Sequence, residues 1–287
     1  MKVGIIAELL RKPLHECLKR ASELGAEGVQ LYANRPICNL LQMDKKQLAD
    51  LKKFCEEQKL EISAVCGDLG GHGFQIASEN PQRIKTFKQI IDVTRTLGCN
   101  IVTTHVGVIP SAKDHPNYKT MMSALKELGE YAAANDVVLA IETGPESPET
   151  LKRFLDDAGS KGLGVNLDPA NLVMVLDADP AEAVYTLKDY IVHTHAKDGV
   201  HFRKCDPQKV YDAFAEGGFE KLVAETGALF AEVPLGQGSV NWKQYLAALK
   251  AIKPACRCAP IGAWQAPIET PTRQRWPPSS SRDPHHH

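Results

Sequence analysis

The feature that most constrains this chain is an alternation of short apolar runs with amphipathic segments, repeated at intervals of about 30 residues. Short runs rich in β-branched and other apolar residues are typical of buried strands. We expect seven of them, at Lys2–Glu8, Gly28–Ala33, Glu61–Asp68, Asn100–Gly107, Val137–Gly144, Gly162–Asp168 and Tyr190–Asp198. Seven strands in one repeating order, each followed by a connecting segment, favour a parallel sheet covered by helices.

The connecting segments carry helical spacing and helix-end signals. We expect helices at Leu14–Leu24, Lys45–Gln58, Pro81–Leu97, Lys119–Ala134, Pro148–Ala158 and Pro180–Lys188. Asp44 precedes the second helix as an N-cap candidate. Gly25 and Gly98 follow the first and third helices, where glycine commonly ends a helix.

This number of strand–helix units predicts a single domain over residues 1–253 with the (β/α)8 TIM-barrel fold. An open doubly wound sheet is the alternative. Its usual glycine-rich nucleotide loop is absent after the first strand, where Glu8-Leu9-Leu10-Arg11 stands instead.

Charge and composition exclude several functional classes. The chain has 287 residues, with 34 basic and 35 acidic side chains and a net charge of −1. This balance gives no electrostatic reason to expect nucleic acid or a membrane surface as a partner. No apolar run approaches the roughly 20 residues of a membrane helix, and no secretion signal is recognised. The eight scattered cysteines show no disulfide framework. We therefore expect a cytoplasmic protein with reduced thiols and a small-molecule partner.

Three polar residues stand at the ends of consecutive apolar strands. Glu142 follows Val137–Ile141, Asp168 follows Gly162–Leu167, and His195 lies in Tyr190–Asp198. The carboxyl ends of barrel strands face one shared mouth, so these side chains should meet there. Two carboxylates and an imidazole suit Mn²⁺, Zn²⁺, Co²⁺ or Mg²⁺. We interpret the set as a metal site, although each residue alone has a structural explanation as a helix cap, an ion pair or a packed histidine.

Four further side chains are candidates for supporting roles. His193 lies on the same strand face as His195 and either orients this ligand or packs in the core. His105, at the end of the fourth expected strand, either contacts substrate or packs. His72 lies in the glycine-rich loop Gly70–Gly73, which points to a functional role. Lys197 alternates with His195 and is placed to reach substrate oxygens.

Several motifs resemble the sugar phosphate isomerase/epimerase family of xylose isomerase-like TIM barrels. They are Lys2-Val3-Gly4, Gly70-Gly71-His72-Gly73, Ile141-Glu142, Leu167-Asp168-Pro169-Ala170-Asn171, His193-x-His195-x-Lys197-Asp198 and Pro234-Leu235-Gly236-Gln237-Gly238. The resemblance covers about residues 1–253 and is more specific for the superfamily than for any one substrate. Relatives include ketose 3-epimerases, inosose isomerases and dehydratases, and endonuclease IV.

The resemblance implies a reaction and a ligand set. One divalent ion, most often Mn²⁺, would be held by Glu142, Asp168, His195 and a last glutamate on the eighth strand. It would polarise a ketose carbonyl, while Glu142 and the last glutamate exchange a proton with an enediolate. The resemblance also implies substrate contacts for Asn171 and His201, and homo-oligomers are common among such proteins.

The chain departs from the family pattern after residue 253. The expected glutamate would fall near Trp264, and Pro267–Pro284 has no helical or strand periodicity. We expect an irregular tail over residues 254–287 in place of the eighth strand and helix, consistent with a shifted reading frame and a tag remnant at His285–His287. The edges of the first and seventh strands would then be open unless the tail or a second subunit covers them. Glu269 is the nearest acidic residue, but it stands about five residues after the position expected for the glutamate.

The leading functional hypothesis is a metal-dependent sugar isomerase or epimerase. The first alternative is a lyase, which dehydrates an inosose or eliminates a group from a 3-keto-glycoside after the same proton abstraction. DNA repair of the endonuclease IV type is a second alternative, disfavoured by the net charge and by the few histidines at strand ends. The third is a catalytically impaired barrel that acts in binding or assembly, because the second glutamate is missing.

Overall fold

The structure is a computed structural model that describes residues 2–252 and 261–264. Its strands form a closed barrel in the order β1-β10-β7-β6-β5-β4-β3-β2, with every neighbouring pair parallel. These strands are β1 (Lys2–Ile6), β2 (Gly28–Tyr32), β3 (Glu61–Cys66), β4 (Ile101–Thr104), β5 (Val138–Glu142), β6 (Leu163–Leu167), β7 (Ile191–Ala196) and β10 (Ile261–Trp264). The expected TIM barrel is confirmed, and the seven strands predicted from the sequence all form.

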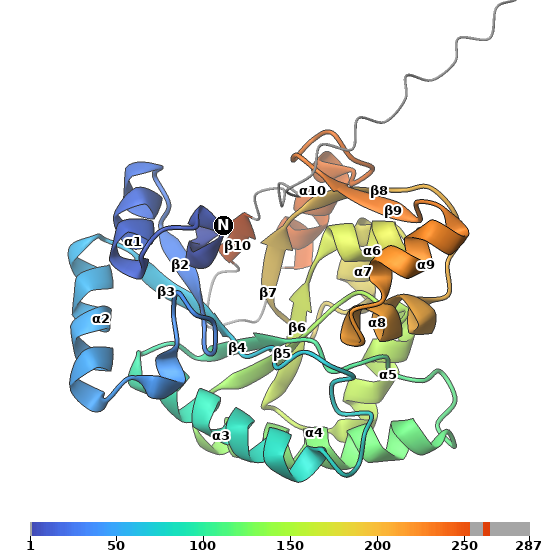
Figure 1. The fold of residues 1–287 in the computed structure, drawn as a ribbon, viewed down its shortest axis with the longest axis horizontal. Helices are drawn as coiled ribbons and strands as arrows, with labels where there is room; N and C mark the ends of the chain where they lie inside the picture. The colour runs from blue at the N-terminus through green and yellow to red at the C-terminus, as the bar shows by residue number, and fades with distance from the viewer. Residues whose placement is uncertain (1, 253–260, 265–287) are drawn as a thin grey trace, which may run out of the picture.

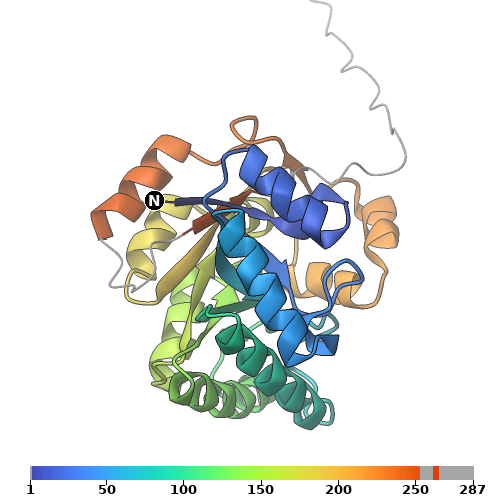
Figure 2. The same cartoon turned by 90° about the vertical axis from the view of Figure 1, so that its left-hand side faces the viewer.

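Helices surround this sheet on its outer side (Figures 1 and 2). The helices of the described residues are α1 (Leu14–Glu23), α2 (Lys45–Glu57), α3 (Asn80–Thr96), α4 (Pro116–Ala134), α5 (Pro148–Ala158), α6 (Pro169–Leu176), α7 (Pro180–Thr186), α8 (Pro207–Ala215), α9 (Phe219–Thr226) and α10 (Trp242–Ile252), with short 3-10 turns at η1 (Ala7–Leu10) and η2 (Leu40–Gln42). Of these, α8 and α9 belong to the hairpin described below and not to the outer layer. The six predicted helices are confirmed to within three residues at their ends. In the part of the chain described, no helix is both long and apolar enough to cross a membrane.

The predicted helix boundaries have the expected local causes. Asp44 accepts a hydrogen bond from Gln47 N, and the Gln47 side chain accepts one from Asp44 N, which is a complete capping box. Gly25 and Gly98 follow α1 and α3 with φ of +83° and +78°, a left-handed conformation that glycine adopts without strain.

The main core lies between the barrel strands and the helices. Strands β5 and β6 are almost entirely buried, and helix side chains such as Phe87, Leu125 and Phe154 are buried in the same core. Each strand therefore needs apolar residues on both faces, which explains why the strands read as continuous apolar runs.

Part of the tail that we expected to be irregular forms β10, which fills the eighth position of the barrel and covers the edges of β1 and β7. Its residues pair with β1 in the register Lys2↔Ile261 to Ile5↔Trp264, and with β7 in the register Gly262↔Thr194 to Trp264↔Ala196. Backbone pairing needs neither apolar periodicity nor a particular side chain, so the unusual composition did not reveal this strand. The other residues of the predicted tail, Glu269 included, lie outside the described part.

One region was not predicted as structured. Between β7 and α10 the chain forms an antiparallel hairpin of β8 (Asp198–His201) and β9 (Phe230–Val233), with α8 and α9 between its two strands. Figure 1 shows this segment in orange beside α6, and both hairpin strands contact α6. The hairpin thereby lies next to the carboxyl ends of β6 and β7.

Candidate metal centre

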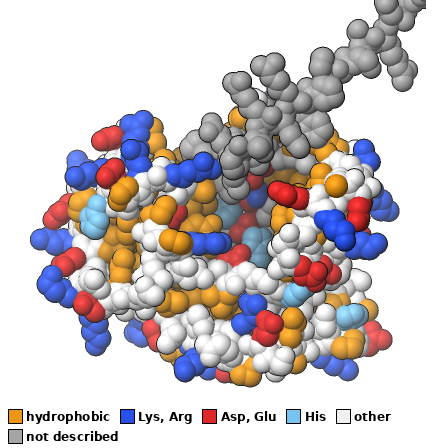
Figure 3. All heavy atoms as spheres, viewed as in Figure 1, with side chains coloured by type: hydrophobic (Ala, Val, Ile, Leu, Met, Phe, Trp, Pro, Cys, Tyr) orange, Lys and Arg blue, Asp and Glu red, His pale blue; other side chains and the backbone are white. Residues whose placement is uncertain are grey.

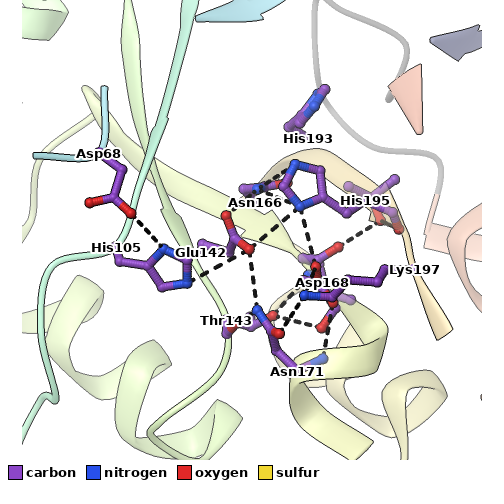
Figure 4. Close-up of polar contacts among 12 residues, drawn as sticks. Asp68, His105, Glu142, Thr143, Asn166, Asp168, Asn171, His193, His195 and Lys197 are labelled. Carbon is purple, nitrogen blue, oxygen red and sulfur yellow. Dashed lines mark hydrogen bonds and ion pairs between the residues drawn. The ribbon is translucent and has the colours of Figure 1, made fainter. Parts of the chain in front are cut away.

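Three side chains from neighbouring strands converge at the mouth of the barrel. Glu142 ends β5, Asp168 follows β6 directly, and His195 is the next-to-last residue of β7. One ligand atom of each lies within 4.8 Å of the others. His195 Nδ1 is 3.3 Å from Asp168 Oδ2 and 3.5 Å from Glu142 Oε1, and Figure 4 shows the three groups turned toward one another. The sequence-predicted set is therefore brought together.

The chemistry of this donor set fits a divalent cation. The side chains of Glu142, Asp168 and His195 are only 10%, 0% and 5% exposed. Burying two carboxylates this close to each other is costly unless cations compensate them. Carboxylate oxygens and one imidazole nitrogen are suitable ligands for Mn²⁺, Zn²⁺, Co²⁺ or Mg²⁺.

Asp168 combines its place in this triad with a structural role. It is the N-cap of α6, where its Oδ1 accepts a hydrogen bond from Asn171 N at 2.9 Å. Its own backbone N donates to Thr143 Oγ1 at 2.8 Å. The helix cap thus uses one carboxylate oxygen and leaves Oδ2 facing His195, so the cap and ligand interpretations of Asp168 both hold geometrically.

Lys197 and Asn171 make polar contacts with the two carboxylates of the triad. Lys197 Nζ lies 3.1 Å from Asp168 Oδ2 and donates to Asn171 Oδ1 at 2.6 Å. Asn171 Nδ2 donates to Glu142 Oε1 at 3.2 Å. Both residues were expected to contact substrate, and the structure places both at the triad.

Two histidines flank the triad on different sides. His105 Nε2 is 3.7 Å from Glu142 Oε1, and its Nδ1 is 3.3 Å from Asp68 Oδ2. His193 is buried and does not approach the triad carboxylates. Its Nε2 lies 3.1 Å from Gln30 Oε1, which is itself 3.3 Å from His195 Nε2. His193 also packs edge-to-face against the His195 ring, with the ring centroids 5.8 Å apart, so it can support His195 directly and through Gln30. Hydrogen-bond directions here depend on the ring tautomers.

The charges of the site are balanced by cationic side chains. Burial lowers the pKa of His195, but Glu142 and Asp168 outweigh it and raise this pKa to about 9. Burial raises the pKa of Asp168, but Lys197 and His195 hold it well below its usual range. His105, although buried, has its pKa raised to about 9 by Glu142 and Asp68. His195 must release its proton to ligate a metal ion.

The pKa of His193 shifts in the opposite direction to those of His195 and His105. Burial lowers its pKa to about 3, with His195 adding to the effect. A neutral imidazole beside Gln30 is consistent with a supporting or packing role, the two readings that the sequence left open.

A cavity of about 280 Å³ opens beside His105, between the loop after β3 and helix α8. Its lining includes Asp68, His72, His105, Tyr211 and Asp212. His72 Nδ1 is 3.2 Å from Asp212 Oδ1, so this histidine lies at the cavity but away from the triad. Figure 3 shows histidine and acidic side chains gathered in a hollow near the middle of this face.

His201, like His72, is a predicted substrate contact that the described geometry does not bring to the triad. It lies on β8, and its Nδ1 is 2.9 Å from the Met174 carbonyl oxygen. Several residues of the site were not predicted: Gln30, Asp68, Asn166, Tyr211 and Asp212. Asp68 had a usable signal, since it stands at a strand end, whereas Tyr211 and Asp212 come from α8, which was not expected.

Comparison with protein families matches residues 18–258 to the xylose isomerase-like TIM barrel. The chain belongs to this family. Among solved structures it is similar to a xylose isomerase domain protein from Planctomyces limnophilus, with 22% identity, a TM-score of 0.74, and 91% of this chain and 90% of the other covered.

Two other similar structures carry more specific descriptions. A probable 3-DHS dehydratase from Bacillus anthracis has 18% identity, a TM-score of 0.70 and coverage of 93% of this chain and 92% of its own. A D-tagatose 3-epimerase-like protein has 19% identity with the same TM-score and coverage. At these identities the likeness shows the fold alone. A search of curated proteins finds no match.

Proposed function

We propose that the protein is a divalent-metal-dependent isomerase or epimerase of a small ketose, acting by proton transfer next to the carbonyl. The observation that carries this proposal is the convergence of Glu142, Asp168 and His195 within 4.8 Å at the barrel mouth. Active sites of TIM barrels lie at this end, and one of the similar solved structures is described as a D-tagatose 3-epimerase-like protein.

Glu142 Oε1, Asp168 Oδ2 and a ring nitrogen of His195 would hold the ion, with Mn²⁺ the leading candidate. When bound, it would polarise the carbonyl and acidify the adjacent C–H bond as a Lewis acid.

Glu142 is the residue that would carry the proton. Asn171 Nδ2 and Asn166 Nδ2 lie 3.2 and 3.3 Å from its two carboxylate oxygens and fix its orientation. His105 and His195 outweigh burial and keep the pKa of Glu142 below its usual value, so the carboxylate is ionised and ready to accept a proton.

Cationic donors would bind the oxygens of the substrate. Lys197 and His105 border the triad and have N–H groups for carbonyl or hydroxyl oxygens. The cavity beside His105 would take the rest of the molecule, with His72 and Asp212 as hydrogen-bonding groups on its wall.

A metal-dependent lyase is the nearest alternative, because elimination begins with the same proton abstraction. The two reactions are distinguished by their products. Incubation with a keto-sugar releases water or an aglycone if the protein is a lyase, and yields an epimer or isomer if it is an epimerase or isomerase. A catalytically impaired barrel would give neither product.

The deciding experiment is metal analysis of the purified protein beside Glu142→Ala. We expect about one Mn, Zn or Co ion per chain, lost in the variant, because removing one of three ligands opens the site. Glu149→Ala, an exposed change on α5, is the matched control and should keep its metal. A wild-type protein without metal after reconstitution with Mn²⁺ would overturn the proposal.

A further inference from the structure

Glu232 is a carboxylate beside the triad that the proposed mechanism does not use. It lies on β9, directly opposite Gly199 of β8. Residues opposite each other in an antiparallel pair point to the same face, and residues two apart on one strand do as well. Lys197 lies directly before β8, two positions from Gly199, and its ammonium group is close enough to Glu232 for their charges to interact.

Lys197 and Gly199 both lie against α6. A side chain at Gly199 would meet Met174 of α6, and Lys197 Nζ contacts Asp168 and Asn171 at the N-terminus of the same helix. The charge of Glu232 acts on Lys197, and its own surroundings include Lys197, Asp168 and His195. Glu232 is therefore a neighbour of the candidate metal ligands.

One oxygen of Glu232 has no hydrogen-bond donor. Oε1 is shielded from solvent, and no donor among the described residues meets it. A buried acceptor without a partner costs free energy, because it loses its hydrogen bond to water on folding. A ligand that supplies a donor at this position would remove that cost.

A purely structural role explains this arrangement poorly. Lys197 already has two close partners, Asp168 Oδ2 at 3.1 Å and Asn171 Oδ1 at 2.6 Å. The β8–β9 pairing uses backbone groups and does not depend on the Glu232 side chain. Burial and the nearby Asp168 raise the pKa of Glu232, so its position is unfavourable for a charge that serves only as a counterion.

We propose that Glu232 is a substrate-binding residue, whose carboxylate accepts a hydrogen bond from a hydroxyl group of the sugar beside Lys197. This inference rests on the proposed function, since it takes a polyhydroxy ketone as the ligand. Lys197 donates to an oxygen and Glu232 accepts from a hydroxyl, so the pair selects a substrate with a hydroxyl group there. The same carboxylate repels a phosphate or carboxylate group at that position.

The test uses the full chain loaded with Mn²⁺, in the wild type, Glu232→Ala and Glu232→Gln, with Glu220→Gln on the exposed face of α9 as the matched control. Metal content and thermal unfolding are measured first, without sugar. We expect the metal content of all four proteins to be equal. The Glu232 variants should unfold at the wild-type temperature or above it, because Glu232→Ala removes the unpaired buried oxygen and Glu232→Gln removes the partly buried charge.

Binding of D-fructose, D-tagatose and D-psicose is then measured by calorimetry. For any sugar that the wild type binds, Glu232→Ala should weaken the affinity about 10-fold to 100-fold, as expected for a hydrogen bond to a charged group. The affinity of Glu232→Gln should lie between those of the wild type and Glu232→Ala, because its amide oxygen accepts a hydrogen bond without carrying a charge. Glu220→Gln should match the wild type.

Each result bears on the proposal. Unchanged affinity in Glu232→Ala, or unfolding several degrees below the wild type without sugar, would overturn the role of Glu232 and leave the metal-dependent function standing. If the metal-loaded wild type binds none of the three ketoses, the proposed substrate class fails and the Glu232 proposal falls with it.

Discussion

At the scale of single residues, Asp198 explains the structure of a sequence motif that lies outside the candidate metal centre. Its carboxylate accepts hydrogen bonds from the backbone N of Gly199, Gly236, Gly238 and Val240 and from Trp242 Nε1, over 2.8–3.2 Å. A Cβ atom at Gly238 would collide with Asp198 Oδ1. The Pro234–Gly238 motif is therefore a loop wrapped around one buried carboxylate.

We predict that Asp198→Asn lowers the free energy of unfolding by about 2–4 kcal/mol, because an amide nitrogen would face N–H donors and leave several of them unpaired. Denaturant titration measures the change. Asp189→Asn, at an exposed position, is the control and should stay within about 0.5 kcal/mol of the wild type. A similarly small effect of Asp198→Asn would show that the loop holds without this carboxylate.

Glu146 gives a prediction about pH. Burial raises the pKa of this carboxyl to about 8 from an ordinary value of 4.5. Between these two values the folded protein retains a proton that the unfolded chain releases, so stability should fall as pH rises through this window. The slope contributed by one such group is at most about 1.4 kcal/mol per pH unit.

Glu146→Gln should remove this contribution. We expect its unfolding free energy to decline less steeply than that of the wild type between pH 5 and about 8. Comparing the two proteins cancels the titration of the histidines, which they share. Parallel stability curves across the window would contradict the raised pKa.

At the scale of elements, the helices and strands predicted from the sequence are those whose residue pattern reflects their burial. The elements that were not predicted carry no such pattern. Strands such as Val138–Glu142 are apolar on both faces and were readily recognised. The hairpin strand β9 reads Phe-Ala-Glu-Val and is half-buried throughout, so it carries no clear alternation. The ligand triad was predictable because barrel geometry places strand ends together. Gln30, buried within β2, and Glu232 could not be assigned, because their importance depends on contacts with distant residues.

The glycine-rich loop after β3 is held by close backbone contacts. Gly73 has φ +60°, and a Cβ there would collide with the backbone of Val106. Phe74 N donates to Val106 O at 2.8 Å, which ties the loop to the end of β4. His72 is thereby held in a fixed wall of the cavity.

Gly70 provides a matched comparison, because its φ is +66° but a Cβ there would meet no atom within 4 Å. Both Gly70→Ala and Gly73→Ala should lower the free energy of unfolding by about 1–2 kcal/mol, because alanine is strained in the left-handed backbone conformation. We predict that Gly73→Ala lowers the free energy of unfolding by at least about 1–3 kcal/mol more than Gly70→Ala does, because the loop must move away from Val106, just after β4. Equal losses in denaturant titrations would mean that the contact with Val106 is easily relaxed.

At the scale of the whole molecule, the barrel depends on β10 for closure. The strand has four residues and is hydrogen-bonded on both sides. A proline at Ala263, whose partners are Gly4 and His195, would remove a donor and disturb both ladders.

We predict that Ala263→Pro lowers the unfolding temperature and increases self-association, because the edges of β1 and β7 become available for pairing with other chains. Ala263→Ser keeps the backbone donor and serves as the control. Thermal unfolding and analytical ultracentrifugation give the two readouts. A monodisperse proline variant with the wild-type unfolding temperature would show that closure by β10 contributes little.

The pairing of β1 with β10 also has a consequence for the order of events during folding. The partners Lys2 and Ile261 are separated by almost the whole chain, so the last seam of the barrel is a contact of very high sequence separation. Contacts of this kind form slowly, because the intervening chain must first be ordered. During synthesis β1 can pair with β2 early, but its other edge must wait until residue 261 has left the ribosome. In a living cell, the unpaired side of β1 would then be the surface that a chaperone has the longest time to meet.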